Sequence, residues 1–476
     1  MFTNNRNSIA SRLLAASLCF ISLSYSIPSQ NVQAMGSSYE KCSQPPGNIN
    51  FIAEHSLGLN VSKIPVNISR DTTHYVSHIN IAWSPDGRFF ARKLFIKPER
   101  KTSLLQIFDA GTGNIIIQRE LEGQIDEMFW SPDSQSLAFP VFGNGETRVQ
   151  LLNLITQEDQ FVELEKRIEL ISQYPGIEWS PDSQHFAIVG EFQNSHQSEN
   201  SVQIISIRGS SPSGKVIYEG GGVGDLAWSP NSSELAIAHL VGFNYVVSIF
   251  SLREQNRLEI PNSVGIDSVE WFGNNKLLIV GSREIGLIDF TNNNEFINTP
   301  PDLGFIIALS NKRQYFAVRT YDQDEIYDYL GTTTRIFDLE TNEFVFETPQ
   351  GRFRGDQYWS QIMWSPDDKY LAINDAECGL SVYATVTGDL VFHTSMVEHN
   401  ISGRPLIMFG LSWSPDSRYL AMSGEDGDFR IINLETQREV ARIEHGSTAY
   451  FVLWSPDGQK ILMSGEYGEF IIELER

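Results

Sequence analysis

The stretch Trp83-Ser84-Pro85-Asp86 decides the fold, because copies of it recur along the whole chain. The nine copies are separated by 38 to 55 residues, with a mean period of about 46. A regular period of this length indicates a repeat protein rather than a series of unrelated domains. Full copies begin at Trp83, Trp130, Trp179, Trp364, Trp413 and Trp454, Trp228 begins a near copy, and weaker versions begin at Trp271 and Leu309.

Each repeat unit is predicted to contain four short strands. In the eighth unit the expected strands are residues 406–413, 419–423, 429–434 and 439–443. Ser-Pro-Asp-Gly suits a type I turn after the first strand, because Pro presets φ and Asp and Gly tolerate the remaining positions. An Asp-Gly pair at residues 426–427 favours a hairpin between the second and third strands. The Trp at the end of the first strand is expected to cover the space between adjacent sheets.

Repeated four-stranded units are typical of the blades of a β-propeller. The ninth unit ends after its third strand, so we expect residues 51–65 to supply its outer strand and to close the ring. The sequence therefore predicts an all-β fold, a single β-propeller closed by an N-terminal strand. Motif counting gives nine blades. Eight blades with one unit outside the ring is the alternative, since the units at Trp271 and Leu309 are degenerate.

The second half of the repeat resembles that of the WD40 family. Residues 423–436 carry small residues, an Asp-Gly turn, an apolar strand and a Leu-Glu-Thr close, and residues 337–341 and 108–113 repeat the closing part. The Gly-His pair of the family is mostly missing, and Phe-Asp, Asn-Leu or Ser-Leu replaces its Trp-Asp end. The propeller repeats of TolB-like periplasmic proteins, which also carry Trp-Ser-Pro-Asp-Gly, are a related alternative. Either resemblance implies a propeller over residues 51–476.

Residues 1–34 have the organisation of a secretory signal peptide. Two arginines precede an apolar run of about fifteen residues, and the segment ends in small residues around Ala34. A single membrane anchor is the alternative, although an anchor normally needs about twenty apolar residues. We expect a periplasmic or secreted protein with a flexible tail at residues 35–50 and no membrane insertion after the signal is removed.

The formal net charge is −24, which disfavours nucleic acid and favours cationic partners. Export leaves two cysteines, Cys42 and Cys378. In an oxidising compartment they could form one disulfide. One exposed tail thiol and one buried strand thiol are the alternative.

Catalytic motifs are missing from the sequence. It has no His-Glu-x-x-His, no Gly-x-Ser-x-Gly and no Walker phosphate loop, so we expect no enzyme and no cofactor. Four carboxylates gather in one acidic stretch, and oxygen ligands at such spacing suit calcium. A plain solvated loop is the alternative. These carboxylates belong to Asp322, Asp324, Glu325 and Asp328.

Length variation is predicted at one end of the blades. The first and third turns are short, whereas residues 191–201, 320–332, 348–359 and 393–410 form longer second turns or blade-to-blade connections. Repeat proteins generally place such insertions on the binding face. The last three segments contain residue types that are enriched at interface hot spots. The candidate binding residues are Tyr321, Tyr327, Tyr329, Arg352, Phe353, Arg354, Tyr358, Trp359 and Arg404.

The sequence therefore favours an exported, monomeric, non-enzymatic scaffold that binds a protein or peptide through this face. Loop growth without any partner is one alternative. The other is a propeller enzyme, or a sugar- or metal-binding protein, with its site at the mouth of the central channel.

We predict that the mature protein begins at or near Met35, because the small residues around Ala34 suit a signal peptidase. N-terminal sequencing and intact-mass measurement of exported protein check this. A cytoplasmic product that retains residues 1–34 would contradict it, and an uncleaved membrane-bound product would favour the anchor.

Overall fold

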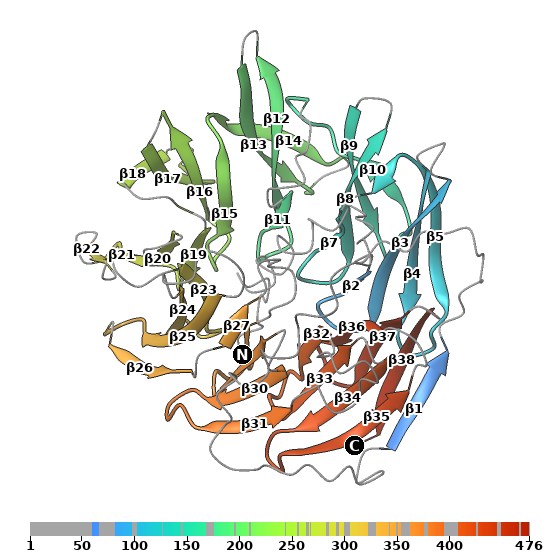
Figure 1. Cartoon of the computed structure of the whole chain (residues 1–476). Helices are drawn as coiled ribbons and strands as arrows, with labels where there is room; N and C mark the ends of the chain where they lie inside the picture. The colour runs from blue at the N-terminus through green and yellow to red at the C-terminus, as the bar shows by residue number, and fades with distance from the viewer. Residues whose placement is uncertain are drawn as a thin grey trace, which may run out of the picture. The chain divides into compact units, whose positions relative to one another are not determined.

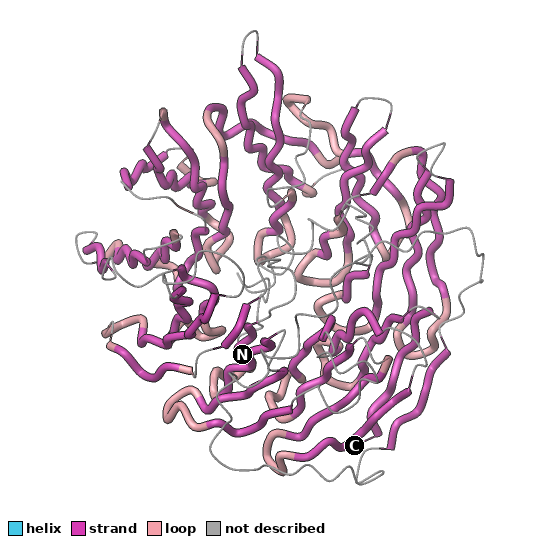
Figure 2. The backbone as a smooth tube through the Cα atoms, viewed as in Figure 1, coloured by secondary structure: helices cyan, strands magenta, loops and turns pink. Residues whose placement is uncertain are grey.

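The computed structural model is all-β, and Figure 2 shows its described backbone as strands and turns without a helix. The described strands form nine separate sheets. The structure describes residues 60–65 and 81–475 except 98–101, 126, 144–145, 168–175, 195–196, 209–210, 243, 255–256, 263–265, 267, 282–284, 292–294, 299–304, 322–329, 342, 349–350, 354–361, 376–378, 395–407, 425–426, 445–448 and 466–467.

The chain divides into two compact units, of which the first contains the described residues from 81 to 298. Five sheets belong to it, labelled in Figure 1 and called blades 1 to 5 here. Their strands are β2 (Ile81–Trp83), β3 (Phe89–Lys97), β4 (Thr102–Asp109) and β5 (Ile115–Glu122); β6 (Gln124–Ile125), β7 (Phe129–Trp130), β8 (Ser136–Gly143), β9 (Glu146–Asn153) and β10 (Asp159–Phe161); β11 (Ile177–Trp179), β12 (His185–Asn194), β13 (Gln197–Ser206) and β14 (Ser213–Gly220); β15 (Val223–Trp228), β16 (Glu234–Val241), β17 (Asn244–Ser251) and β18 (Arg257–Asn262); β19 (Ser268–Phe272), β20 (Lys276–Val280), β21 (Ile285–Asp289) and β22 (Glu295–Asn298).

The second unit contains the described residues 60–65 and those from 305 to 475, which form blades 6 to 9. Their strands are β23 (Phe305–Leu309), β24 (Tyr315–Tyr321), β25 (Leu330–Asp338), β26 (Phe344–Glu347) and β27 (Gly351–Phe353); β28 (Ile362–Trp364), β29 (Tyr370–Asp375), β30 (Gly379–Ala384) and β31 (Leu390–Thr394); β32 (Met408–Trp413), β33 (Tyr419–Gly424), β34 (Asp428–Asn433) and β35 (Arg438–Glu444); β36 (Ala449–Trp454), β37 (Lys460–Gly465), β38 (Gly468–Glu475) and β1 (Asn60–Pro65).

The nine sheets are the four-stranded blades of a nine-bladed β-propeller, so the predicted fold class and the count of nine are confirmed. Consecutive strands pair antiparallel within each blade. The predicted strands of blade 8 differ from β32, β33, β34 and β35 by at most two residues at either end. Blades 2 and 6 each have one additional short strand.

The predicted N-terminal strand completes blade 9. β1 pairs antiparallel with β38 over six residues, from Asn60 opposite Glu475 to Pro65 opposite Phe470. The sheet order is β1-β38-β37-β36, so the first strand of the chain is the outer strand of the last blade. Residues 51–59, which the sequence also assigned to this strand, lie outside the described residues.

The core lies between neighbouring blades, where side chains from facing sheets interlock. On β8, Leu137 and Phe139 pack with residues of blade 1, whereas Ala138 packs with residues of blade 3. Because both faces of such a strand are buried, it is an almost continuous apolar run. The repeated Trp residues lie in these layers as predicted, since seven of them are at most 8% exposed and Trp83 is half-buried.

The prediction that residues 191–201 form a long second turn is wrong. β12 and β13 pair through Asn194 and Gln197, so the connection is only residues 195–196. The polar composition suggested a loop. Backbone hydrogen bonds nevertheless extend the hairpin here, and such bonds do not depend on apolar side chains.

Deletion of residues 35–66 is predicted to destabilise the protein and to promote association. Without β1, the outward N–H and C=O groups of β38 become an open strand edge, which templates intermolecular pairing. A matched deletion of residues 35–58 keeps β1 and should melt like the parent. Thermal unfolding and analytical ultracentrifugation of the three proteins measure both effects. A 35–66 deletion that stays as stable and monomeric as the parent would show that β1 is dispensable.

Candidate functional site

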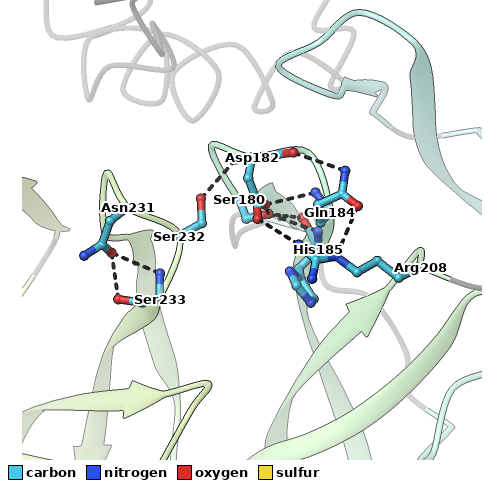
Figure 3. Close-up of polar contacts among 8 residues, drawn as sticks. All are labelled: Ser180, Asp182, Gln184, His185, Arg208, Asn231, Ser232 and Ser233. Carbon is cyan, nitrogen blue, oxygen red and sulfur yellow. Dashed lines mark hydrogen bonds and ion pairs between the residues drawn. The ribbon is translucent and has the colours of Figure 1, made fainter.

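The first turn of each blade is fixed by its own side chains. In blade 3, the Ser180 hydroxyl donates to the Asp182 carboxylate at 2.7 Å and accepts the His185 N–H at 3.0 Å (Figure 3). The same carboxylate accepts the Gln184 N–H at 3.0 Å. A type I turn followed by a left-handed residue then leads into the second strand. That residue is Ser183, with φ of 59°.

The turns of neighbouring blades are also bonded to one another. In each of these contacts, the backbone N–H of the Asp in one first turn donates to the side-chain hydroxyl of the left-handed Ser in the first turn of the next blade. These bonds are Asp86 to Ser134 at 3.0 Å, Asp133 to Ser183 at 3.0 Å, Asp182 to Ser232 at 2.9 Å and Asp367 to Ser417 at 2.9 Å. The Asp182–Ser232 bond is drawn in Figure 3. We call this series the turn belt.

The turn belt explains why serine occupies a left-handed position. Ser134, Ser183, Ser232 and Ser417 all have φ between 59° and 63°. A left-handed backbone costs a non-glycine residue about 1–2 kcal/mol, and the hydrogen bond to the next turn offsets that cost. Blades 1 and 9 have Gly87 and Gly458 at this position, at φ of 73° and 71°. Glycine removes the strain but offers no acceptor side chain.

The repeated Trp residues form a second series of bonds beside the belt. Five of the indole N–H groups donate to a backbone carbonyl of the preceding blade. The acceptor is always the residue just before the repeated Trp of that blade. The pairs are Trp130 to Ala82, Trp179 to Phe129, Trp228 to Glu178, Trp271 to Ala227 and Trp413 to Met363, at 2.9 to 3.2 Å. The motif therefore joins blade to blade at the first-turn end, which leaves the other end of the blades free to vary.

Two of the turn carboxylates, Asp86 and Asp367, have lowered pKa values. Burial alone would raise the pKa of Asp86, but hydrogen bonds from the Arg88 N–H and the Ser84 hydroxyl lower it below its usual value. The pKa of Asp367 is lowered in the same way, against burial, by Lys369 and Ser365. Burial lowers the pKa of His185, whose ring lies 6.3 Å from that of Trp228. These groups have structural partners, which favours a structural role for the first-turn end.

One buried pair has the geometry of a nucleophile and its base. His239 Nε2 and Ser248 Oγ lie 2.7 Å apart on neighbouring strands of blade 4. A Ser–His pair acts on a substrate only when the hydroxyl is accessible. Ser248 is 0% and His239 is 1% exposed, and Tyr218 of blade 3 covers the His239 ring at 4.5 Å. The pair is therefore part of the packing between blades 3 and 4.

At the second-turn end of blade 6, three strands come together. β24 pairs with β25 up to Tyr321 opposite Thr332. On its other edge, β25 pairs with β27, with Thr332 opposite Gly351 and Leu330 opposite Phe353. The second turn and the connection to blade 7 thus start from one sheet. We call β27 with the paired ends of β24 and β25 the blade 6 platform.

The platform locates some of the predicted binding residues. Tyr321 lies at the end of β24, and Arg352 and Phe353 lie in β27, so the structure brings the bases of segments 320–332 and 348–359 together. Segment 393–410 starts in β31 of blade 7 and ends in β32 of blade 8. The other candidates lie outside the described residues: Tyr327, Tyr329, Arg354, Tyr358, Trp359, Arg404, the acidic Asp322, Asp324, Glu325 and Asp328, and the cysteines Cys42 and Cys378.

A charge network that was not predicted from the sequence lies at the second-turn end of blade 8. Arg430, which is 5% exposed, lies 3.2 Å from Asp428 and 3.8 Å from Glu439. Arg442 binds both oxygens of Glu439, at 2.7 and 2.9 Å. Arg430 on β34 is paired opposite Arg442 on β35, and this pairing is known only from the register of the two strands. Opposite charges on one sheet face were the available signal.

His393 begins segment 393–410, at the end of β31. Its Nδ1 lies 3.1 Å from the Ser381 hydroxyl on the adjacent strand. Burial lowers the pKa of His393, so the ring is neutral at pH 7. This strand end is therefore uncharged where the segment leaves blade 7.

Within the described ranges, no three His, Cys, Asp or Glu residues are grouped so that they could hold a metal ion. The same part of the chain contains no helix long and apolar enough to cross a membrane.

Comparison with known proteins agrees with the repeat geometry. Residues 397–433, which include β32, β33 and β34, match the family described as WD domain, G-beta repeat. The chain is a β-propeller in which one repeat matches this family model. No curated protein matches the chain.

Solved structures resemble its fold. A crystal structure of the eukaryotic initiation factor is similar at a TM-score of 0.52 and 16% identity, over 77% of this chain and 88% of that one. The C-terminal WD40 domain of Sif2 has a TM-score of 0.45 and 11% identity, over 87% and 99% of the two chains. Kuenenia stuttgartiensis hydrazine synthase has a TM-score of 0.38 and 12% identity, over 83% of this chain and 94% of that one. At these identities the similarity concerns the fold alone.

The belt predicts a contrast between two serines. Ser183→Ala removes the acceptor of the Asp133 N–H in the neighbouring blade, and it should lower the free energy of unfolding by about 1–3 kcal/mol. Ser233→Ala removes only a bond to Asn231 within its own turn, so its cost should stay within about 0.5 kcal/mol. Urea titrations of both variants measure the difference. Equal costs would contradict a stabilising role for the belt.

Proposed function

We propose that this protein is an exported, non-enzymatic scaffold that binds a protein or peptide through the second-turn ends of blades 6 to 8. The partner would contact residues 320–332, 348–359 and 393–410. The carrying observation is the blade 6 platform, because it joins the bases of two of these segments through one sheet.

A rigid base for the loops favours binding. Ordering a flexible loop on association costs about 0.5–1.5 kcal/mol for each side chain that is immobilised, and preorganisation lowers this cost. The platform fixes both ends of segment 320–332 by antiparallel pairing between β24 and β25. β27 extends the same sheet from β25. The loops therefore start from fixed strands, as binding loops on rigid scaffolds do.

The composition of the loops favours a protein partner. Tyr, Trp and Arg are the residue types that contribute most to interface hot spots, and the three segments contain eight of them among the candidates. The net charge of −24 would steer a cationic partner toward the protein by long-range attraction. Because the segment at residues 1–34 has signal-peptide features, we place this partner in the cell envelope or outside the cell.

The buried His239–Ser248 pair argues against the enzyme alternative at that position, since packing covers it. We include calcium binding in the proposal only as a means of stabilising segment 320–332. The calcium ligands would be Asp322, Asp324, Glu325 and Asp328.

We predict that a triple variant, Tyr327→Ala, Arg354→Ala and Trp359→Ala, binds the partner at least about thirtyfold more weakly, because one true hot spot contributes about 2 kcal/mol or more. Proteins captured from envelope extract by the parent and lost by the triple variant identify the partner, and calorimetry with that purified partner gives the affinities. Melting temperatures of parent and variant should agree, since surface substitutions usually change stability little.

The matched control changes three exposed residues in the third turns of the same blades, Glu340→Ala, Thr387→Ala and Glu435→Ala. It should bind like the parent. Undiminished binding by the first variant together with loss of binding in this control would show that the opposite end of these blades is the binding face.

A further inference from the structure

The connection from blade 2 to blade 3 runs along the outer edge of blade 3. The chain leaves blade 2 after β10, where the Val162 N–H donates to the Val149 carbonyl at 3.0 Å. It then continues to β14, the outer strand of blade 3. Val162 is 8% exposed, and Leu164 packs with it in the core between these two blades. We call residues 162–167 the strap.

The strap binds the backbone of β14 as an additional strand would, and it pairs parallel with this edge. The Glu163 N–H donates to the Pro212 carbonyl at 3.1 Å, and the Glu163 carbonyl accepts the Gly214 N–H at 2.8 Å. Further along, the Glu165 carboxylate accepts the Val216 N–H at 2.6 Å. Because β13 pairs with the opposite edge of β14, these bonds are made on the side from which another strand could pair.

A buried side chain of β13 fixes the end of the strap. Gln203 is 0% exposed, and its carboxamide accepts the Lys166 N–H at 3.2 Å and donates to the Lys166 carbonyl at 2.7 Å. The Lys166 ammonium lies 3.1 Å from the centre of the Phe192 ring and forms an ion pair with Glu219. A cation over an aromatic ring is attracted to it. The main chain and the side chain of Lys166 are therefore both bound to blade 3.

The other described outer strands have features that discourage pairing with another chain. β10, β22, β26, β27 and β31 have three to five residues each, and β1 and β18 contain a proline. β35 has four charged residues among seven. β5 is eight residues long, but three of its last four residues are charged.

β14 lacks these features. Its eight residues are Ser-Gly-Lys-Val-Ile-Tyr-Glu-Gly, which include no proline and have the uncharged run Val-Ile-Tyr in the middle. Outward N–H and C=O groups on such a strand are a template for pairing with a second chain. The strap binds these groups from Pro212 to Val216, so it protects the outer strand that its own sequence leaves unprotected.

We propose that the strap prevents β14 from pairing antiparallel with β14 of a second copy of this chain. Such a pair would have a two-fold axis, with the same edge contributed by each copy. Centred on Ile217, it places Lys215 of each copy opposite Glu219 of the other, and opposite charges on paired strands attract. In the closed protein the strap binds Glu219 through Lys166. This inference does not depend on the function proposed for blades 6 to 8.

Two glutamates of the strap provide a matched pair of variants. Glu165→Ala removes the acceptor of the Val216 N–H, whereas Glu163 is bonded to β14 through its backbone, which Glu163→Ala retains. We expect hydrogen exchange at the Val216 amide to become at least about tenfold faster in Glu165→Ala and to be unchanged in Glu163→Ala, since exchange reports local opening. Mass spectrometry with fragmentation to single residues measures both rates.

The variant Glu165→Ala/Lys166→Ala/Gln203→Leu releases the strap at three contacts. We expect it to sediment as a dimer at a concentration where the parent sediments as a monomer. Adding Val216→Pro removes an outward N–H, a change that an edge strand tolerates, and should restore the monomer. Glu165→Ala/Lys166→Ala leaves the buried Gln203 in place, and it repeats the measurement if the triple variant fails to fold.

Three results would overturn the proposal. A released protein that stays monomeric although Val216 exchanges faster would show that the open edge does not attract a second copy. A dimer that persists after Val216→Pro would show that another surface makes the contact. Equal exchange at Val216 in Glu163→Ala and Glu165→Ala would show that the Glu165 carboxylate does not hold the strap on β14.

Discussion

The hydrogen bonds between the turns of neighbouring blades are the constraint on which the rest of the structure depends. An isolated four-stranded sheet has two apolar faces to cover, and a neighbouring blade covers each of them. The turn belt and the Trp indole bonds fix where that neighbour lies, because each bond needs a donor and an acceptor from two different repeats. The repeated motif therefore specifies the contact between repeats as well as the turn within one repeat.

This constraint also accounts for the unequal ends of the blades. A longer first turn would move the Asp N–H away from its acceptor in the next blade, so this end tolerates little change. The second turns and connections make no belt bonds. Blade 6 uses that freedom to add β27 beside β25, and blade 3 uses it to extend β12 and β13 to ten residues each. Binding surfaces are expected where the chain is free to vary on a rigid base.

The sequence predicted those features that depend on one repeat at a time. The position of each Trp, the turn after it and the strands of blade 8 follow from local pattern, and β1 was predicted because the ninth repeat lacks an outer strand. Polar contacts that depend on how strands and neighbouring blades are aligned were missed. Neither the acceptor role of Ser183 nor the meeting of Arg430 with Glu439 can be seen without the register of the strands. Residues 191–201 were assigned wrongly because their polar side chains concealed a hairpin held by backbone bonds.

The degenerate repeats show that the bond between blades, and not the motif, is what the fold requires. Blade 5 has lost Ser-Pro-Asp, yet the side chain of Asn274 accepts the Asn231 N–H at 3.1 Å, as a belt serine would. In blade 7, Asp368 replaces the belt serine and accepts the N–H groups of both Asn311 and Lys312 of blade 6, at 2.7 and 2.6 Å.

Blade 6 is thereby bound more extensively to its neighbour than the regular blades are. The Asn311 amide also donates to the Ser365 carbonyl at 2.8 Å, and the Lys312 ammonium donates to the Asp367 carbonyl at 3.0 Å. Charge-assisted bonds of this kind are stronger than those between neutral groups. Blade 6 is also the blade that carries the platform. The repeat that departs furthest from the motif has therefore replaced one belt bond by several, at the blade that adds β27 beside β25.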